Sequence, residues 1–149
     1  MPEMRLPLFL SLILILLGGS CRPPTPPPAP RLIQPVSASG LGVEDLVIGS
    51  GPMPKPGQTC TVEALGWVEE HGAKGHLFLD TRKQGYPTVF PFGVGRVIKG
   101  WEEGLATMKQ GGKRRLRVPP SLGYTAREAG EDIPAGATLI FEIDLIGVR

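Results

Sequence analysis

The chain contains little of what metal sites, redox centres and nucleophilic enzymes require. It has two cysteines and two histidines among 149 residues. His71 and His76 are not at ligand spacing with a cysteine or carboxylate cluster, so we expect them to face solvent. The sequence also has no CxxC motif, no phosphate-binding loop and no Ser–His–Asp set. Its chemistry must therefore come from other residue types.

The net charge is also small. Sixteen basic and fourteen acidic residues give +2 at pH 7, and removing residues 1–20 takes away only Glu3 and Arg5, which leaves +2. This balance argues against nucleic acid as a partner. The basic cluster Lys113-Arg114-Arg115 falls in an alternating strand pattern, which we interpret as a solvated edge of a sheet.

Long apolar runs are limited to residues 6–17, directly after Arg5. This run is too short for a membrane-spanning helix, which needs about 20 residues. A positive residue followed by a short apolar stretch is typical of a secretory signal. We therefore interpret residues 1–20 as a signal peptide and expect the protein to be exported.

Small residues at positions 18–20 precede Cys21, which resembles a bacterial lipoprotein signal whose cysteine becomes the lipidated first residue. The match is imperfect, since Gly18 stands where leucine is usual. The alternative is a plain secretory signal cleaved near Ser20, with Cys21 left as an ordinary thiol. Lipidation predicts a protein of the cell envelope, anchored to the membrane and facing the periplasm or the exterior. With Cys21 lipidated, Cys60 has no partner and is expected to be a buried, inert thiol.

Residues 21–41 are interpreted as a linker, because residues 22–35 contain seven prolines. Proline lacks a backbone N–H and fixes φ, so neither a helix nor a strand ladder runs through such a stretch. An extended, semi-rigid spacer is expected. After a lipid anchor it would hold the folded domain away from the membrane surface.

Residues 42–149 are predicted to form one α+β domain. The long segment 119–136 is punctuated by proline and glycine, and a loop of this length in a small domain is usually functional. Residues 81–87 are also expected to be a loop. Apolar alternation and helical spacing predict the elements. The predicted strands are residues 43–48, 59–68, 76–80, 88–92, 113–118 and 138–146, and the one predicted helix is residues 99–108.

The most informative segment is residues 97–105, read together with Tyr124 and residues 133–141. It places an indole, backbone donors and apolar walls where they can form a dry pocket. Such a pocket suits a proline ring better than a charged substrate. By spacing alone, Trp101 and Ile98 could equally be core residues of an amphipathic helix.

From about residue 43 onward, the chain resembles the FKBP-type peptidyl-prolyl cis-trans isomerase family. The resemblance is most specific in residues 97–105, 119–124 and 133–145. It implies a bent antiparallel sheet of five or six strands wrapped around one short helix. The family's pocket also carries over, position by position. The implied catalytic residues are Asp80, Trp101, Tyr124 and Phe141, and the implied substrate-binding residues are Val97, Ile98, Leu79, Phe78, Phe90 and Ile133.

Each carried-over residue has a role implied by the family. Trp101 would form the floor of the pocket, and the backbone N–H of Ile98 and the hydroxyl of Tyr124 would bind carbonyl groups. Strict spacing puts Leu79 at the position of the aromatic that precedes Asp80, with Phe78 as its neighbour. Asp80 has an alternative interpretation as a turn or capping carboxylate.

Three positions depart from the family pattern. Ala64 replaces a tyrosine beside the aspartate, Thr88 replaces a second pocket aromatic, and Thr125 replaces the glycine after the tyrosine. These differences predict a shallower, less aromatic pocket and weak binding of macrolides.

The resemblance predicts an isomerase that speeds X–Pro rotation during folding of exported proteins. A dry site favours the twisted imide over the planar one, and this chemistry needs no cofactor, metal or nucleophile. The alternative is a weakly catalytic or non-catalytic peptide-binding chaperone on the same fold. Expected partners are proline-containing unfolded or extended polypeptides, and the default state is a monomer.

Overall fold

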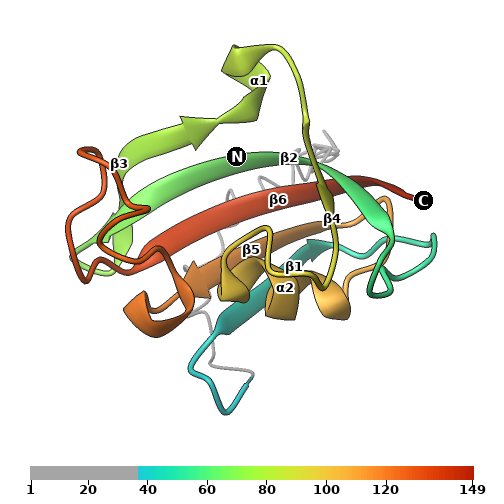
Figure 1. The fold of residues 1–149 in the computed structure, drawn as a ribbon, viewed down its shortest axis with the longest axis horizontal. Helices are drawn as coiled ribbons and strands as arrows, with labels where there is room; N and C mark the ends of the chain where they lie inside the picture. The colour runs from blue at the N-terminus through green and yellow to red at the C-terminus, as the bar shows by residue number, and fades with distance from the viewer. Residues whose placement is uncertain (1–36) are drawn as a thin grey trace, which may run out of the picture. The chain divides into compact units, whose positions relative to one another are not determined.

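An antiparallel sheet of six strands forms the body of the domain (Figure 1). The strands follow the order β1-β5-β6-β2-β3, and β4 pairs with the first residues of β2. This arrangement confirms the predicted α+β class. The strands are β1 (Gly42–Val47), β2 (Thr59–Glu70), β3 (Ala73–Asp80), β4 (Thr88–Pro91), β5 (Lys113–Val118) and β6 (Leu139–Val148).

The computed structural model describes residues 37–149. The predictions for the signal peptide, Cys21 and the linker up to residue 36 lie outside the described residues. Within residues 37–149, no helix is both long enough and apolar enough to cross a membrane. Leu41, which the sequence places at the end of the linker, is 1% exposed and belongs to the core.

Side chains alternate across the sheet as the sequence predicts. Along β2, the buried residues Cys60, Val62 and Ala64 alternate with partly exposed ones. Cys60 is a free thiol at 0% exposure, and burial raises its pKa. β2 ends later and β3 begins earlier than the sequence predicts, so the turn that joins them contains only His71 and Gly72.

One helix, α2 (Lys99–Ala106), packs against the inner face of the sheet, the face whose side chains form the core (Figure 1). Trp101 and Leu105 point into the core. Two glycines, Gly100 and Gly104, lie against β5. A Cβ at Gly100 would lie 2.6 Å from Val118 Cγ1, and one at Gly104 would lie 2.5 Å from Leu116 Cδ1. The absence of side chains at these two positions therefore allows the helix to approach the sheet closely.

The expected loop at residues 81–87 instead begins with a short helix, α1 (Thr81–Gln84). Asp80 is its N-cap, because its carboxylate accepts hydrogen bonds from the N–H groups of Arg82 and Lys83, both at 3.1 Å. Gly85 ends the helix at φ 83°, a left-handed conformation that glycine adopts easily. The prediction of a plain loop was wrong because a single helical turn leaves almost no periodic signal.

The interpretation of Lys113-Arg114-Arg115 as a solvated edge was also wrong. The β5 strand lies between β1 and β6, and Arg114 is only 5% exposed. Its guanidinium donates to both carboxylate oxygens of Asp45, at 2.6 and 3.1 Å, and to the carbonyl oxygen of Gly104 at 2.5 Å. A buried cation is tolerated here because it is both paired and hydrogen-bonded.

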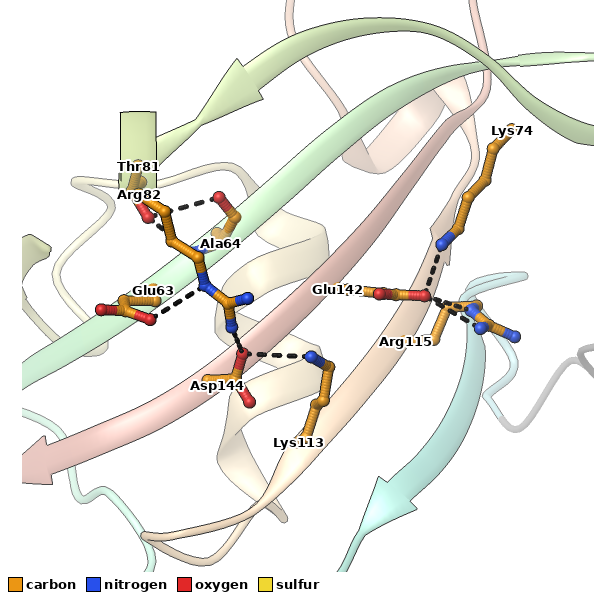
Figure 2. Close-up of polar contacts among 9 residues, drawn as sticks. All are labelled: Glu63, Ala64, Lys74, Thr81, Arg82, Lys113, Arg115, Glu142 and Asp144. Atoms are coloured by element: carbon orange, nitrogen blue, oxygen red, sulfur yellow. Dashed lines mark hydrogen bonds and ion pairs between the residues drawn. The ribbon is translucent and has the colours of Figure 1, made fainter. Parts of the chain in front are cut away.

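On the outer face of the sheet, which is opposite to the face that carries the core, ion pairs connect the strands (Figure 2). Glu142 on β6 contacts Lys74 of β3 at 2.5 Å and Arg115 of β5 at 2.9 Å. Burial alone would raise the pKa of Glu142, but the hydrogen bonds and charges of these two cations outweigh it and lower the pKa. The carboxylate is therefore ionised at neutral pH and links β6 to the adjacent β5 and, across β2, to β3.

Contacts with residues of β2 and β6 also hold α1 against the sheet (Figure 2). Arg82 donates to Glu63 of β2 at 3.1 Å and to Asp144 of β6 at 2.9 Å. The buried hydroxyl of Thr81 accepts from the N–H of Ala64 and donates to its carbonyl oxygen. These contacts fix the end of β3.

We expect Gly104→Ala to destabilise the protein by about 1–3 kcal/mol, because the new methyl group overlaps the fully buried Leu116. The better helix propensity of alanine offsets only about 1 kcal/mol of strain. Urea unfolding measures the difference. Gly147→Ala is the matched control, since its Cβ would meet Thr61 at an ordinary 3.6 Å. Equal stability of the two variants would contradict the proposed close approach of the helix.

Asp80→Ala should cost about 1 kcal/mol through loss of the α1 cap, whereas Asp80→Asn should retain most of the stability because asparagine also caps well. The measurement is again the free energy of unfolding. Asp132→Ala serves as control, because it removes an exposed carboxylate that makes no ion pair within residues 37–149. An Asn variant as unstable as the Ala variant would argue against capping.

Candidate active site

A cavity of about 620 Å³ opens beside the N-terminus of α2. Its wall comes from residues 95–102, from residues 120–128, and from Leu79 of β3 and Thr88 of β4. This volume lies within the range of about 300–1,000 Å³ that is usual for ligand pockets. The apolar part of the wall consists of Leu79, Val97, Ile98, Trp101, Pro120 and Tyr124.

Trp101 lies at the base of this cavity and is 4% exposed. Its ring meets Phe141 edge-on, with centroids 5.4 Å apart, and Phe90 at 6.0 Å. The buried indole N–H has no acceptor within residues 37–149. Ring packing, and not hydrogen bonding, therefore holds the indole in place.

A second aromatic layer lies behind the cavity wall. Phe141 is fully buried and contacts Phe78 edge-on at 5.7 Å, and Phe78 contacts Tyr124 at 6.4 Å. These contacts connect the base of the pocket to Tyr124. The two candidate residues in β3 therefore have different positions: Leu79 lines the cavity, and Phe78 contacts Tyr124 from behind the cavity wall.

Tyr124 follows a short 3-10 helix, η1 (Pro120–Leu122), and lines the cavity. Burial raises the pKa of its hydroxyl, and the charge of Glu128 raises the pKa further. The hydroxyl is therefore protonated at neutral pH. It hydrogen-bonds no other group within the described part of the chain, so it is available to donate to a ligand.

Ile98 is the N-cap residue of α2. Its carbonyl oxygen accepts from the N–H of Trp101 at 3.0 Å and from that of Glu102 at 3.3 Å. Its own N–H precedes the helix and is one of the groups that helical bonding leaves unpaired. Val97 and Ile98 are both half-buried and line the cavity, so an apolar wall and a backbone donor stand side by side.

The structure does not place every predicted site residue on the cavity wall. Asp80 adjoins the wall residue Leu79, but its own carboxylate caps α1, and Lys83 Nζ lies 3.9 Å from it. Phe90 and Phe141 pack behind Trp101. Ile133 packs against the core and is not among the lining residues.

Four charged side chains at the cavity were not among the predicted site residues: Arg96, Lys99, Glu102 and Glu128. Their positions next to Val97, Ile98 and Tyr124 were a signal that sequence reasoning could have used. Residues 125–128 also read Thr-x-x-Glu, which is the signature of a capped turn.

Comparison with known proteins identifies the family. The family model for FKBP-type peptidyl-prolyl cis-trans isomerases matches residues 51–146. An FK506-binding protein of Neisseria meningitidis serogroup B is 48% identical over 109 residues, which are 73% of this chain and 96% of that protein. FK506-binding protein 1 of Dictyostelium discoideum is 44% identical over 108 residues, covering 71% of this chain and 97% of the relative.

Solved structures show the same relationship. The crystal structure of AtFKBP13 matches with a TM-score of 0.69 at 39% identity, covering 77% of this chain and 98% of that one. The crystal structure of FkpA from Escherichia coli matches with a TM-score of 0.67 at 34% identity, covering 76% and 50% of the two chains. The fold, the cavity and these relatives together lead to one conclusion: the chain belongs to the FKBP-type family and is a peptidyl-prolyl cis-trans isomerase.

Proposed function

We propose that the protein accelerates X–Pro rotation in exported polypeptides by holding the half-rotated bond in the pocket above Trp101. The observation that carries the proposal is the convergence of Trp101, Ile98 and Tyr124 on one cavity of about 620 Å³. These residues supply a flat apolar base, a backbone donor and a hydroxyl donor. The cavity has room for a pyrrolidine ring and the adjoining backbone.

The energetics favour binding without covalent chemistry. Conjugation of the amide produces a rotation barrier of about 18–20 kcal/mol. At the transition state this conjugation is lost, so the nitrogen is more pyramidal and the carbonyl carries less separated charge. An apolar site stabilises that state more than the planar, strongly hydrated one. This differential binding lowers the barrier.

The two donors would orient the substrate. The N–H of Ile98 and the hydroxyl of Tyr124 would each bind a carbonyl group of the peptide, one on each side of the twisting bond. Since burial and Glu128 raise the pKa of Tyr124, its hydroxyl remains a donor throughout the neutral range. Leu79, Val97 and Trp101 would surround the ring.

In this proposal, the predicted site residues that do not line the cavity support it from behind: Asp80, Phe141, Phe90, Phe78 and Ile133. Phe141 packs edge-on against the indole of Trp101, and Phe90 packs against it at a tilt. Phe78 packs against Tyr124. Asp80 holds α1 and the end of β3, and its negative charge lies next to the wall residue Leu79. Thr88, standing on the wall where the family has an aromatic ring, leaves macrolides less surface to contact, so we propose weak macrolide binding.

A holding function is the second candidate, and exposed apolar side chains in the segments that line the pocket favour it. Val89, 60% exposed, follows the wall residue Thr88 in the sequence, and Val94, 55% exposed, precedes the wall residue Gly95. Unfolded segments could bind there without rapid turnover. In either role the client would be a proline-containing, extended polypeptide, and we propose that the domain acts as a monomer.

A protease-coupled assay on a short X–Pro peptide tests the isomerase mechanism. Tyr124→Phe should lower kcat/KM about two- to tenfold, the worth of one hydrogen bond, and Trp101→Leu should lower it at least as much by removing the flat base. Tyr86→Phe is the matched control, because it removes a hydroxyl from an exposed tyrosine. If wild-type protein left the uncatalysed exchange unchanged while binding unfolded chains, the holding function would replace this proposal.

We also propose that the protein acts in the cell envelope, anchored through a lipid on Cys21. Replacing this cysteine in Cys21→Ser should move the protein from the membrane to the soluble fraction and abolish fatty-acid labelling, with kcat/KM unchanged. Cys60→Ala should keep both the label and the membrane association. Membrane fractionation that stays the same in Cys21→Ser would contradict lipidation.

A further inference from the structure

Charged side chains line the pocket near both proposed hydrogen-bond donors, the N–H of Ile98 and the hydroxyl of Tyr124. Arg96 and Lys99 line the cavity on either side of the Val97-Ile98 pair, and Glu128 lines it four residues after Tyr124. Apart from the effect of Glu128 on the pKa of Tyr124, the proposed function does not use these charges. They lie where the residues flanking a bound proline would pass.

The carboxylate of Glu128 is held in place. The N–H and the hydroxyl of Thr125 both donate to it, at 3.0 and 2.8 Å. The turn is closed by the N–H groups of Glu128 and Ala129, which donate to the carbonyl oxygen of Thr125 at 2.9 and 3.0 Å. The two bonds from Thr125 lower the pKa of Glu128, so the carboxylate is charged at neutral pH.

This negative charge lies at the Tyr124 end of the pocket. It acts on the tyrosine hydroxyl strongly enough to add to the rise in its pKa that burial causes. Glu128 is the one charged lining residue of segment 120–128, so the lining at this end of the pocket is negative.

The Ile98 end has the opposite sign. Arg96 and Lys99 are exposed, and neither forms an ion pair within residues 37–149. Glu102 is the one acidic lining residue of segment 95–102, and its carboxylate accepts from the N–H of Gly95 at 2.8 Å. Two cations against one carboxylate leave this end positive.

We propose that the pocket mouth is electrically polarised, and that Arg96, Lys99 and Glu128 select substrates by the charges on the two sides of the proline. This inference rests on the proposed function. A peptide bound through Ile98 and Tyr124 presents one flank to each end of the mouth. A substrate with opposite charges on its two flanks then fits in one orientation and is repelled in the reverse one.

The expected size of the substrate preference follows from the solvent exposure of these charges. A solvent-exposed charge pair changes an equilibrium by about two- to fivefold, and the factors of two pairs multiply, so one peptide should be favoured over its reversed partner by about fourfold or more. The Debye length falls from about 10 Å at 0.1 M salt to about 3 Å at 1 M. The preference should therefore largely disappear at high salt.

The test uses three X–Pro peptides of equal length: one neutral, one with lysine before and glutamate after the proline, and one with these two residues exchanged. Exchange between the cis and trans forms is measured by NMR with the full-length protein, which avoids the specificity of a coupling protease. We expect the two charged peptides to differ by about fourfold or more in kcat/KM at low salt, with the neutral peptide between them. Equal rates for the two would overturn the proposal.

Variants identify the residues responsible. Glu128→Gln and Arg96→Gln should each reduce the ratio of kcat/KM between the two charged peptides about two- to threefold, a ratio from which any common effect of the variant on turnover cancels. Glu131→Gln is the matched control, because it removes an acid of the same segment that does not line the cavity. A preference that survives the Glu128 and Arg96 changes together, or that falls equally in Glu131→Gln, would contradict selection by these residues.

The neutral peptide separates the two proposals. If the protein fails to accelerate exchange of any peptide, the proposed mechanism itself fails. If the neutral peptide is turned over and the charged pair shows no difference, only the polarised mouth fails.

Discussion

The close packing of α2 against β5 is the constraint on which the pocket depends. Gly100 and Gly104 have no side chain where Val118 and Leu116 press against the helix. This approach sets the depth of Trp101, whose ring then meets Phe141 edge-on. It also places the start of the helix, and with it the backbone N–H of Ile98, at the cavity. A helix held further away would leave the indole without its aromatic support, and the base of the pocket would no longer be flat.

Charged residues have two separate roles in this domain. Inside the sheet and on its outer face they are paired, as in Arg114 with Asp45 and Glu142 with Lys74 and Arg115. These pairs join strands and hold β3, which carries the wall residue Leu79. At the pocket mouth, in contrast, Arg96 and Lys99 have no ion-pair partner within the described residues. Their charges remain available to a substrate, because no neighbouring strand neutralises them.

Much of the fold follows from local patterns in the sequence. Alternation along β2 and β6, and helical spacing around Trp101, predicted these elements because periodicity depends on neighbouring residues alone. Arg114 shows where such reasoning failed. It lies on the same face of β5 as Leu116 and Val118, so the alternation is consistent with burial, but its charge suggested solvent. Its partner Asp45 is 69 residues away in sequence, and only strand pairing brings the two together. The α1 turn was missed because four residues are too few to show a period.

By itself, the sequence determined the family and the α+β class, and it identified Trp101, Tyr124 and Ile98 as residues of one pocket, because these depend on residue type and short spacing. The tertiary structure alone decided that Leu79 lines the cavity while Phe78 supports Tyr124, and that Phe141 lies behind Trp101. It also brought Arg96 and Glu128 to one pocket mouth. The physical reason is that these positions depend on the pairing of strands distant in sequence and on the packing depth of one helix, neither of which leaves a local pattern.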